Sequence, residues 1–190
     1  MLRKSTSLIG TGIAMTLLGG CLGTENPDFN KQAIEAVQFV NQLEDLPATD
    51  PEMMPQDNSG NVEYRGVAAF NYDVPVTSAN PGADLFADMS LTADFENNDI
   101  SGSITSFNSA NGNVSGTVDV TDGAIVQNLM AANGNGDIVD DGTTIALDLD
   151  LDGQFRGETG TAITGAITGS YTPEGESQGD IFGTFGVDQN

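Results

Sequence analysis

Apolar residues recur at every second position through most of the chain from Val62 to the C-terminus. A period of two is the side-chain period of a β-strand that buries one face. The clearest run is 145–152, where isoleucine and leucine alternate with alanine and aspartate. Short segments of this kind, with polar outer faces, predict an antiparallel all-β barrel or sandwich of eight or nine strands. The expected strands are 62–72, 89–95, 100–104, 114–120, a weaker one at 124–130, 145–152, 163–171 and 181–187.

Dipeptides typical of tight turns follow several of these runs. Asn98-Asp99, Asp122-Gly123 and Asp152-Gly153 are each predicted to reverse the chain into the next strand. Residues 134–142 (GNGDIVDDG) are expected to form a loop that ends in an Asp-Asp-Gly turn.

Glycines occupy the same alternate positions of the expected strands as the apolar residues do. Their presence on this inward face has to be explained, because glycine weakens a strand. A small barrel supplies that reason, since its interior is just wide enough for side chains and a large residue fits opposite a gap. The pattern therefore favours a small, filled, closed barrel over a flat sandwich. The polar outer faces argue against a barrel that spans a membrane. The glycines are Gly66, Gly102, Gly116, Gly165, Gly169 and Gly183, and the expected gap-filling aromatics are Phe70, Phe95, Tyr171 and Phe185.

The N-terminus has the features of a targeting segment. Arg3 and Lys4 precede the uncharged run 5–20, which is shorter than the roughly 20 residues that a membrane-spanning helix needs. The run ends in Leu18-Gly19-Gly20-Cys21, which resembles the bacterial lipoprotein signal of Leu, small, small, Cys. That resemblance implies cleavage before Cys21 and a stable membrane anchor of several acyl chains on its thiol. An ordinary secretory signal with a chance cysteine is the alternative.

The chain is expected to have three parts: a signal peptide (1–20), a lipidated N-terminal segment (21–61) and a barrel (62–190). In the second part, apolar residues three and four apart over 30–46 predict an amphipathic helix, a short helical tether. This helix could dock on the barrel, bind a partner or stiffen the tether. The proline-rich stretch after it is expected to be a linker. Because Leu22, and not aspartate, follows the cysteine, we expect an outer-membrane location, with cell-surface display open.

Composition excludes several classes of function. The chain has no histidine and one cysteine, so it has no Ser-His-Asp triad, no Cys-His pair and no internal disulfide. Its 28 acidic residues against five basic ones argue against binding nucleic acid. Cleavage before Cys21 leaves three bases against the 28 acids, a charge of −25. This charge could steer a basic partner or only keep a glycine-rich barrel in solution.

Asp148, Asp150 and Asp152 are weak candidates for a metal site. With Gly153 they match the first half of a Ca²⁺ loop, but the twelfth position is Thr159 and not glutamate. Leucines between the aspartates suit a strand whose carboxylates point to solvent. A solvated strand is therefore the prediction and Ca²⁺ is the alternative.

No cofactor and no catalytic residue are expected. Without histidine, haem could be held only by a tyrosine or a methionine, and Tyr64, Tyr72 and Tyr171 all lie on the core parity. The acids of the barrel include no pair that spacing or apolar neighbours single out for acid–base chemistry. A carboxylate-dependent hydrolase is therefore the weakest of the functional hypotheses.

The C-terminal segment contains GSYTP at 169–173, an acidic turn at 174–178 and GTFG at 183–186, and the earlier strands contain LTADF at 91–95, ISGSI at 100–104 and YRG at 64–66. These pieces resemble the barrel signature of transferrin-binding protein B-like lipoproteins, and the resemblance extends over 62–190. Thr172 stands where that family usually has glycine. The resemblance implies an eight-stranded barrel on a lipid anchor and a non-catalytic binding role, with a protein or iron-source ligand. A structural lipoprotein that coats the envelope without a specific ligand is the alternative.

Overall fold

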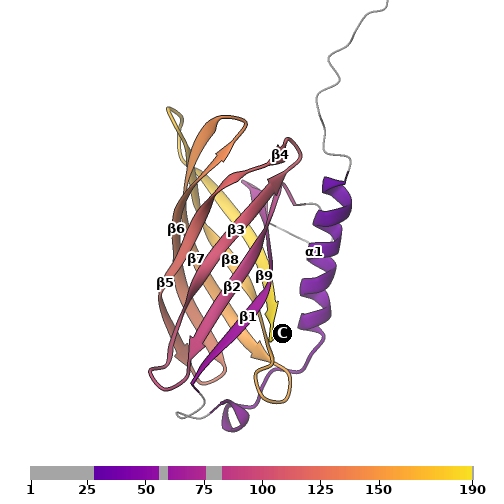
Figure 1. Ribbon diagram of the computed structural model, residues 1–190, viewed down its shortest axis with the longest axis vertical. Helices are drawn as coiled ribbons and strands as arrows, with labels where there is room; N and C mark the ends of the chain where they lie inside the picture. The colour runs from indigo at the N-terminus through magenta and orange to yellow at the C-terminus, as the bar shows by residue number, and fades with distance from the viewer. Residues whose placement is uncertain (1–27, 56–59, 76–82, 190) are drawn as a thin grey trace, which may run out of the picture.

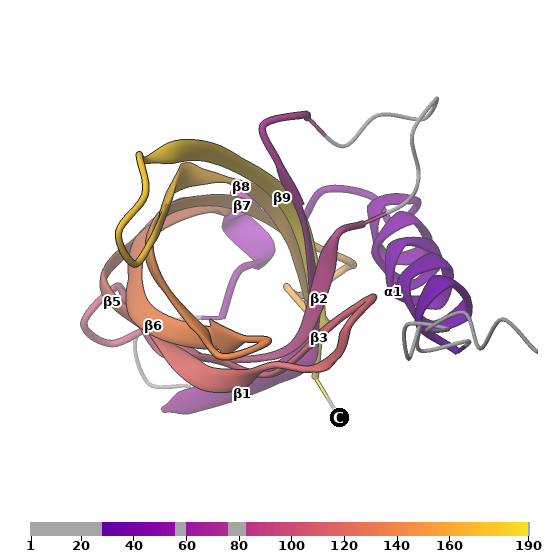
Figure 2. The same cartoon turned by 90° about the horizontal axis from the view of Figure 1, so that it is seen from above.

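Eight long antiparallel strands close into a barrel, as the alternation predicts, in a computed structural model that describes residues 28–55, 60–75 and 83–189. Neighbouring strands follow the order β2-β1-β9-β8-β7-β6-β5-β3, and pairing of β2 with β3 closes the ring (Figures 1 and 2). A two-residue strand, β4, pairs only with the end of β3. The strands are β1 (Asn61–Tyr72), β2 (Leu85–Asp94), β3 (Asp99–Ser109), β4 (Gly112–Asn113), β5 (Ser115–Val126), β6 (Leu129–Asp140), β7 (Thr143–Arg156), β8 (Ala162–Pro173) and β9 (Gly179–Asp188).

Two of the predicted turns are wrong. Asp122-Gly123 lies inside β5, at a shift in register with β6 between Thr121 and Ala124, so it bends the strand and does not reverse it. The reversal comes later, between the paired residues Val126 and Leu129. Asp152-Gly153 lies inside β7, which pairs with β6 and β8 on both sides through this point.

The loop expected at 134–142 is also wrong, because most of it belongs to strand β6. The inward-facing positions of β6 include Ala132, Gly134 and Gly136. Because these residues have a small side chain or none, the sequence of β6 shows almost no alternation of large apolar and polar residues. The Asp-Asp-Gly turn itself is confirmed: Asp141 and Gly142 have φ values of 46° and 81° between β6 and β7.

Aromatic side chains fill the interior over glycines of neighbouring strands. Phe185 on β9 is fully buried, and its ring covers Gly165 on β8 and Gly153 on β7. A Cβ added at Gly153 would lie 2.9 Å from this ring, and one added at Gly183 would lie 3.0 Å from the ring of Phe70. The prediction that large side chains of one strand fill the space left by glycines of the neighbouring strands is therefore confirmed. Tyr171 differs from expectation, since it is only partly buried.

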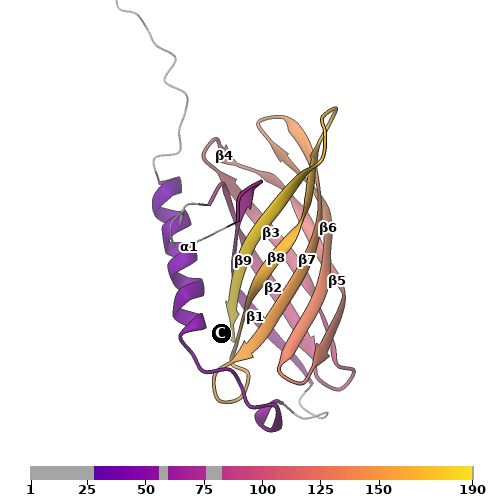
Figure 3. The ribbon, with the colours of Figure 1, turned by 180° about the vertical axis from the view of Figure 1, so that it is seen from behind.

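The helix α1 (Phe29–Glu44) lies on the outside of the barrel, along β9, β1 and β8 (Figures 1 and 3). Small residues allow this close approach: Ala69 of β1 is completely buried beneath the helix, and a Cβ at Gly186 would lie 3.1 Å from Cα of Val40. At the start of the helix, Phe29 stacks on Phe86 of β2 at 5.4 Å between ring centroids. Of the three roles open to the helix, the structure shows docking.

The segment after the helix, which was expected to be a linker, packs against one end of the barrel. Thr49 is buried, its backbone N–H donates to the carbonyl of Phe155, and its hydroxyl donates to the carbonyl of Gly157 at 2.8 Å. After a single turn of 3₁₀ helix (Pro51–Met53), the Met54 side chain enters the core. Residues 47–54 therefore form a cap, at the lower end in Figure 1.

The packed interior predicts a contrast between two adjacent positions of β8. Gly169 faces inward with a φ of +155°, and a side chain there would collide with the carbonyl oxygen of Asp148 on β7. Gly169→Val is expected to destabilise the fold by about 1–3 kcal/mol or more. Thr168→Val, on the exposed outer face, is expected to change stability by at most about 0.5 kcal/mol. Urea unfolding of the full chain, followed by circular dichroism, measures both, and equal effects would contradict the assigned inner and outer faces.

Candidate functional site

Cys21, the expected lipidation site, lies outside the described residues, as does the whole of the expected signal peptide. Within the part of the chain that the structure describes, no helix is long and apolar enough to cross a membrane. The anchor therefore remains a prediction from the sequence.

Asp148, Asp150 and Asp152 stand in a row on the outer face of β7, and all three are exposed. Carboxylates at alternate positions of a strand are roughly 7 Å apart and point the same way, so they share no common centre. Their cross-strand neighbours are neutral: Asp148, for example, lies between Asn135 and Ser170. Over 28–55, 60–75 and 83–189, no three acidic or cysteine side chains are grouped to hold a metal ion.

This row predicts the response to calcium. Millimolar Ca²⁺ is expected to leave the melting temperature nearly unchanged relative to Na⁺ at equal ionic strength, because the aspartates diverge along a strand and cannot wrap one ion. Melting curves followed by circular dichroism provide the measurement. A rise of several degrees that is specific to Ca²⁺ and is removed by Asp150→Asn would contradict the strand interpretation.

The three tyrosines divide between the core and one end of the barrel. Tyr64 is completely buried; its hydroxyl donates to the carbonyl of Gly160 at 2.7 Å, and burial raises its pKa to about 12. Tyr72 and Tyr171 pack together, with ring centroids 4.6 Å apart, at the end of the barrel opposite the cap. The Tyr171 hydroxyl donates to the carboxylate of Asp73, while burial and, to a lesser extent, the Asp140 carboxylate raise the pKa of Tyr72 to about 12. Tyr64 therefore packs in the core as expected, whereas Tyr72 and Tyr171 are partly buried and close one end of the barrel.

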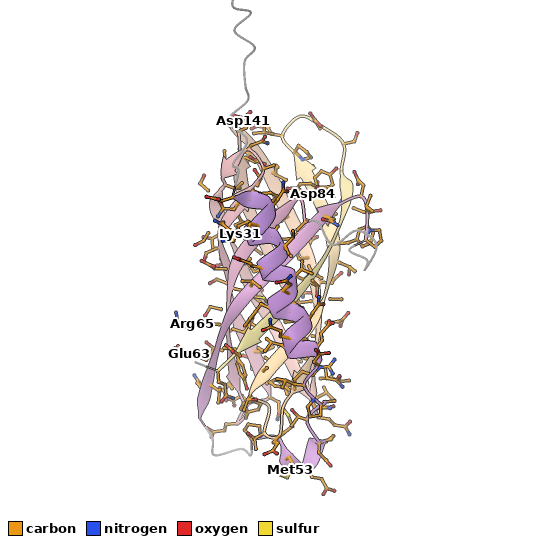
Figure 4. The ribbon with its side chains drawn as sticks, turned by 90° about the vertical axis from the view of Figure 1, so that its right-hand side faces the viewer. Lys31, Met53, Glu63, Arg65, Asp84 and Asp141 are labelled. Carbon is orange, nitrogen blue, oxygen red and sulfur yellow. The ribbon has the colours of Figure 1, made fainter. Side chains whose placement is uncertain are left out.

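The basic side chains of the described residues differ in how they are compensated. Lys31 lies 3.7 Å from Glu35 on the exposed face of α1, and Arg65 lies 3.2 Å from Glu63 on β1 (Figure 4). Arg156, at the end of β7, has no carboxylate of a described residue within 4.0 Å. It is half-buried, whereas Lys31 and Arg65 are exposed. Arg156 therefore differs from the other two in both burial and pairing.

Arg156 lies at one end of a groove between α1 and the outer wall of the barrel, with a volume of about 990 Å³. One side of the groove is formed by Val37, Asn41 and Glu44, which follow one stripe of the helix. Its floor is formed by the outer faces of β7, β8 and β9, where the side chains are mostly small. The sequence has no local signal for this groove, because the groove exists only once the helix has docked. The floor and far wall include Thr164, Ala166, Thr168, Thr184, Phe182, Gln154, Asp152 and Leu129.

The fold and the groove define a filled antiparallel barrel with a helix on its outside, in which space for a ligand lies on the outer surface. No protein-family model matches the chain, and a search of curated proteins finds no match.

Three solved structures that are similar to this chain are of transferrin-binding protein B, and they match the same part of the chain that carries the resemblance in the motifs. A mutant of the vaccine antigen TbpB from Haemophilus parasuis Hp5 is 21% identical, with a TM-score of 0.46 over 75% of this chain and 28% of that one. The isotype 1 protein from serogroup B Neisseria meningitidis is 17% identical, with a TM-score of 0.44 over 76% and 27% of the two chains. Intact Ap-TbpB, with its N and C lobes, is 22% identical, with a TM-score of 0.41 over 75% and 29%. This chain thus spans less than a third of the length of each.

Proposed function

We propose that the protein is a lipid-anchored binding protein of the outer membrane or cell surface, which holds its partner on the outside of the barrel and catalyses no reaction. The observation that carries this proposal is the filled interior. Phe70, Phe107, Phe155 and Phe185 are completely or almost completely buried there, together with aliphatic residues from all eight long strands. Because side chains occupy the interior, a partner is recognised by the outer wall, the helix or the ends of the barrel.

The ionisable groups support a role without catalysis. Catalytic acids and bases usually have a pKa shifted toward the operating pH. Among the described residues, the clear shifts are the raised pKa values of three tyrosines and a lowered pKa of Asp94, whose carboxylate accepts hydrogen bonds from Asn97. None of these shifts brings a group toward neutral pH.

The proposed anchor is close to the barrel along the chain. Helix α1 begins at Phe29, eight residues after Cys21, and a fully extended chain of that length spans at most about 30 Å. Since α1 is docked, lipidation of Cys21 would keep the barrel near the bilayer. The end that carries Tyr72 and Asp84 would then lie nearer the membrane than the cap, because the helix begins beside that end (Figures 1 and 4).

The partner is proposed only as a protein or an iron-source ligand, following the resemblance of the C-terminal motifs. Transferrin-binding proteins bind transferrin, as their name states. The acidic exterior equally suits the alternative of an envelope-coating lipoprotein without a specific ligand, because carboxylates on the outer faces oppose edge-to-edge association of strands.

The anchor is tested by Cys21→Ser. Loss of the thiol that would carry the lipid is expected to release the protein from the membrane fraction or to leave it unprocessed at the larger size. Thr24→Ser, three residues outside the signal box, is the matched control and is expected to behave as wild type. Fractionation and immunoblotting of both variants provide the measurement.

Protease added to intact cells then tests display at the surface. Digestion of the wild-type protein would support a surface location, and protection until the outer membrane is opened would place it on the periplasmic side.

A Cys21→Ser protein that remained in the membrane at wild-type size would overturn the lipid anchor.

A further inference from the structure

We propose that the groove between α1 and the barrel binds an elongated organic carboxylate, whose carboxylate pairs with Arg156 and whose apolar body lies along the outer faces of β8 and β9. The inference gives a ligand class to the binding role proposed above and rests on that role, but it does not depend on lipidation. Two observations support it: the charge of Arg156 has no carboxylate partner among the described residues, and the groove beside it is long and partly apolar.

Arg156 is a half-buried cation that has no carboxylate partner among the described residues. Its Nε donates to the Thr164 hydroxyl at 3.1 Å, and its Nη1 donates to the carbonyl of Leu46 at 3.4 Å. Both acceptors are neutral, and Nη2 has no hydrogen-bond partner among the described residues. A partly desolvated charge is costly unless it is paired. The lack of a carboxylate partner in the part of the chain that the structure describes leaves this position open to an anion from outside.

The two bonds of Arg156 also fix the direction of the guanidinium. Thr164 is 2% exposed, and Leu46 directly follows the C-terminal end of the helix. The group is therefore held at the end of the groove and not on a freely moving side chain. A planar guanidinium held in place pairs with a carboxylate better than a flexible ammonium does.

The rest of the groove suits an apolar body. Its volume of about 990 Å³ is at the upper end of the range usual for ligand pockets, about 300–1,000 Å³. Ala166 and Thr184, which pair across β8 and β9, keep the floor low, and Val37, Leu129 and Phe182 supply apolar contact. Arg156 pairs with Ala162 on β8 while Phe182 pairs with Thr168, so the two ends are six residues or about 20 Å apart. A long, narrow ligand fits this shape.

Two carboxylates, of Glu44 and Asp152, also line the groove. Both side chains are exposed, so water and salt screen their repulsion of an anion more strongly than they screen the half-buried Arg156. The strongly acidic chain still repels anions at long range, and binding should therefore be measured at moderate salt.

The experiment titrates octanoate into the full chain carrying Cys21→Ser, so that no attached acyl group competes, with calorimetry as the readout. Octanol, acetate and octyltrimethylammonium are titrated in parallel. Octanoate is expected to bind more tightly than each of the others by about tenfold or more, because hydrogen bonds to charged groups are the stronger ones. Equal binding of octanol would contradict the pairing with Arg156, and equal binding of acetate would contradict the apolar contact along the groove. No binding of octanoate would overturn the proposal as a whole.

Variants locate the site. Arg156→Gln, which removes the charge and places an amide nitrogen where Nε donates to the Thr164 hydroxyl, is expected to weaken octanoate binding by about tenfold or more. Ala166→Trp fills the floor of the groove and is expected to abolish binding. Ala146→Trp places the same ring on the exposed outer face of β7, at a position that does not line the groove, and is expected to leave binding within twofold of wild type.

Melting curves confirm that each variant is folded. If Arg156→Gln loosens the helix, the comparison between the two tryptophan variants still decides the location, and equal binding by both would overturn it. The Cys21→Ser fractionation has no bearing on this result, so failure of the anchor and failure of the groove are separate outcomes.

Discussion

The burial of aromatic rings over glycine backbones is the contact on which this structure depends. Phe185 reaches across two strand pairings, from β9 over Gly165 to Gly153, and so packs three neighbouring strands against one ring. A small closed barrel has room for such a ring only where adjacent strands bear no side chain. Removal of the rings would leave a cavity, and added side chains at the glycines would meet rings or neighbouring backbone. The same packing that closes the barrel also excludes ligands from its interior.

Because side chains fill the interior, positions at which a ligand or partner can bind are left only on the outer surface. Most of that surface is made of strand faces with exposed aspartate, serine and threonine. The docked helix adds a hollow to this surface, since it approaches the wall closely at Ala69 and Gly186 and leaves a groove beside it over the outer faces of β7, β8 and β9. The groove is thus a consequence of where the small residues of the wall lie: they draw the helix toward β1 and β9 and leave space beside it.

Much of the fold could be predicted from the sequence because a period of two is unambiguous where the inward residues are large. Ile145 to Leu151 predicted β7, and Phe70 with Tyr64 predicted β1. Strand β6 was missed for the opposite reason, since Gly134 and Gly136 give no alternation and their contribution is the space that Leu149 and Val118 fill. The Asp-Gly pairs were misassigned because the same dipeptide suits a hairpin or a bend within a strand, and only pairing with β6 and β8 decides between them. The groove had no local signal, because its walls are brought together from residues 37 to 184.

Arg156 links these levels of structure. Its backbone ends β7 and pairs with Ala48 of the cap, while its side chain holds the carbonyl of Leu46 just beyond the helix. The position of a cation there is favourable on its own, because the last carbonyls of a helix carry partial negative charge. Yet neutral acceptors alone do not balance the charge of a half-buried guanidinium that has no carboxylate partner among the described residues. Arg156 thus contacts the end of the helix and the cap, and at the end of the groove its Nη2 is left without a hydrogen-bond partner among the described residues. The same residue can therefore hold the walls of the site together and select a ligand of negative charge.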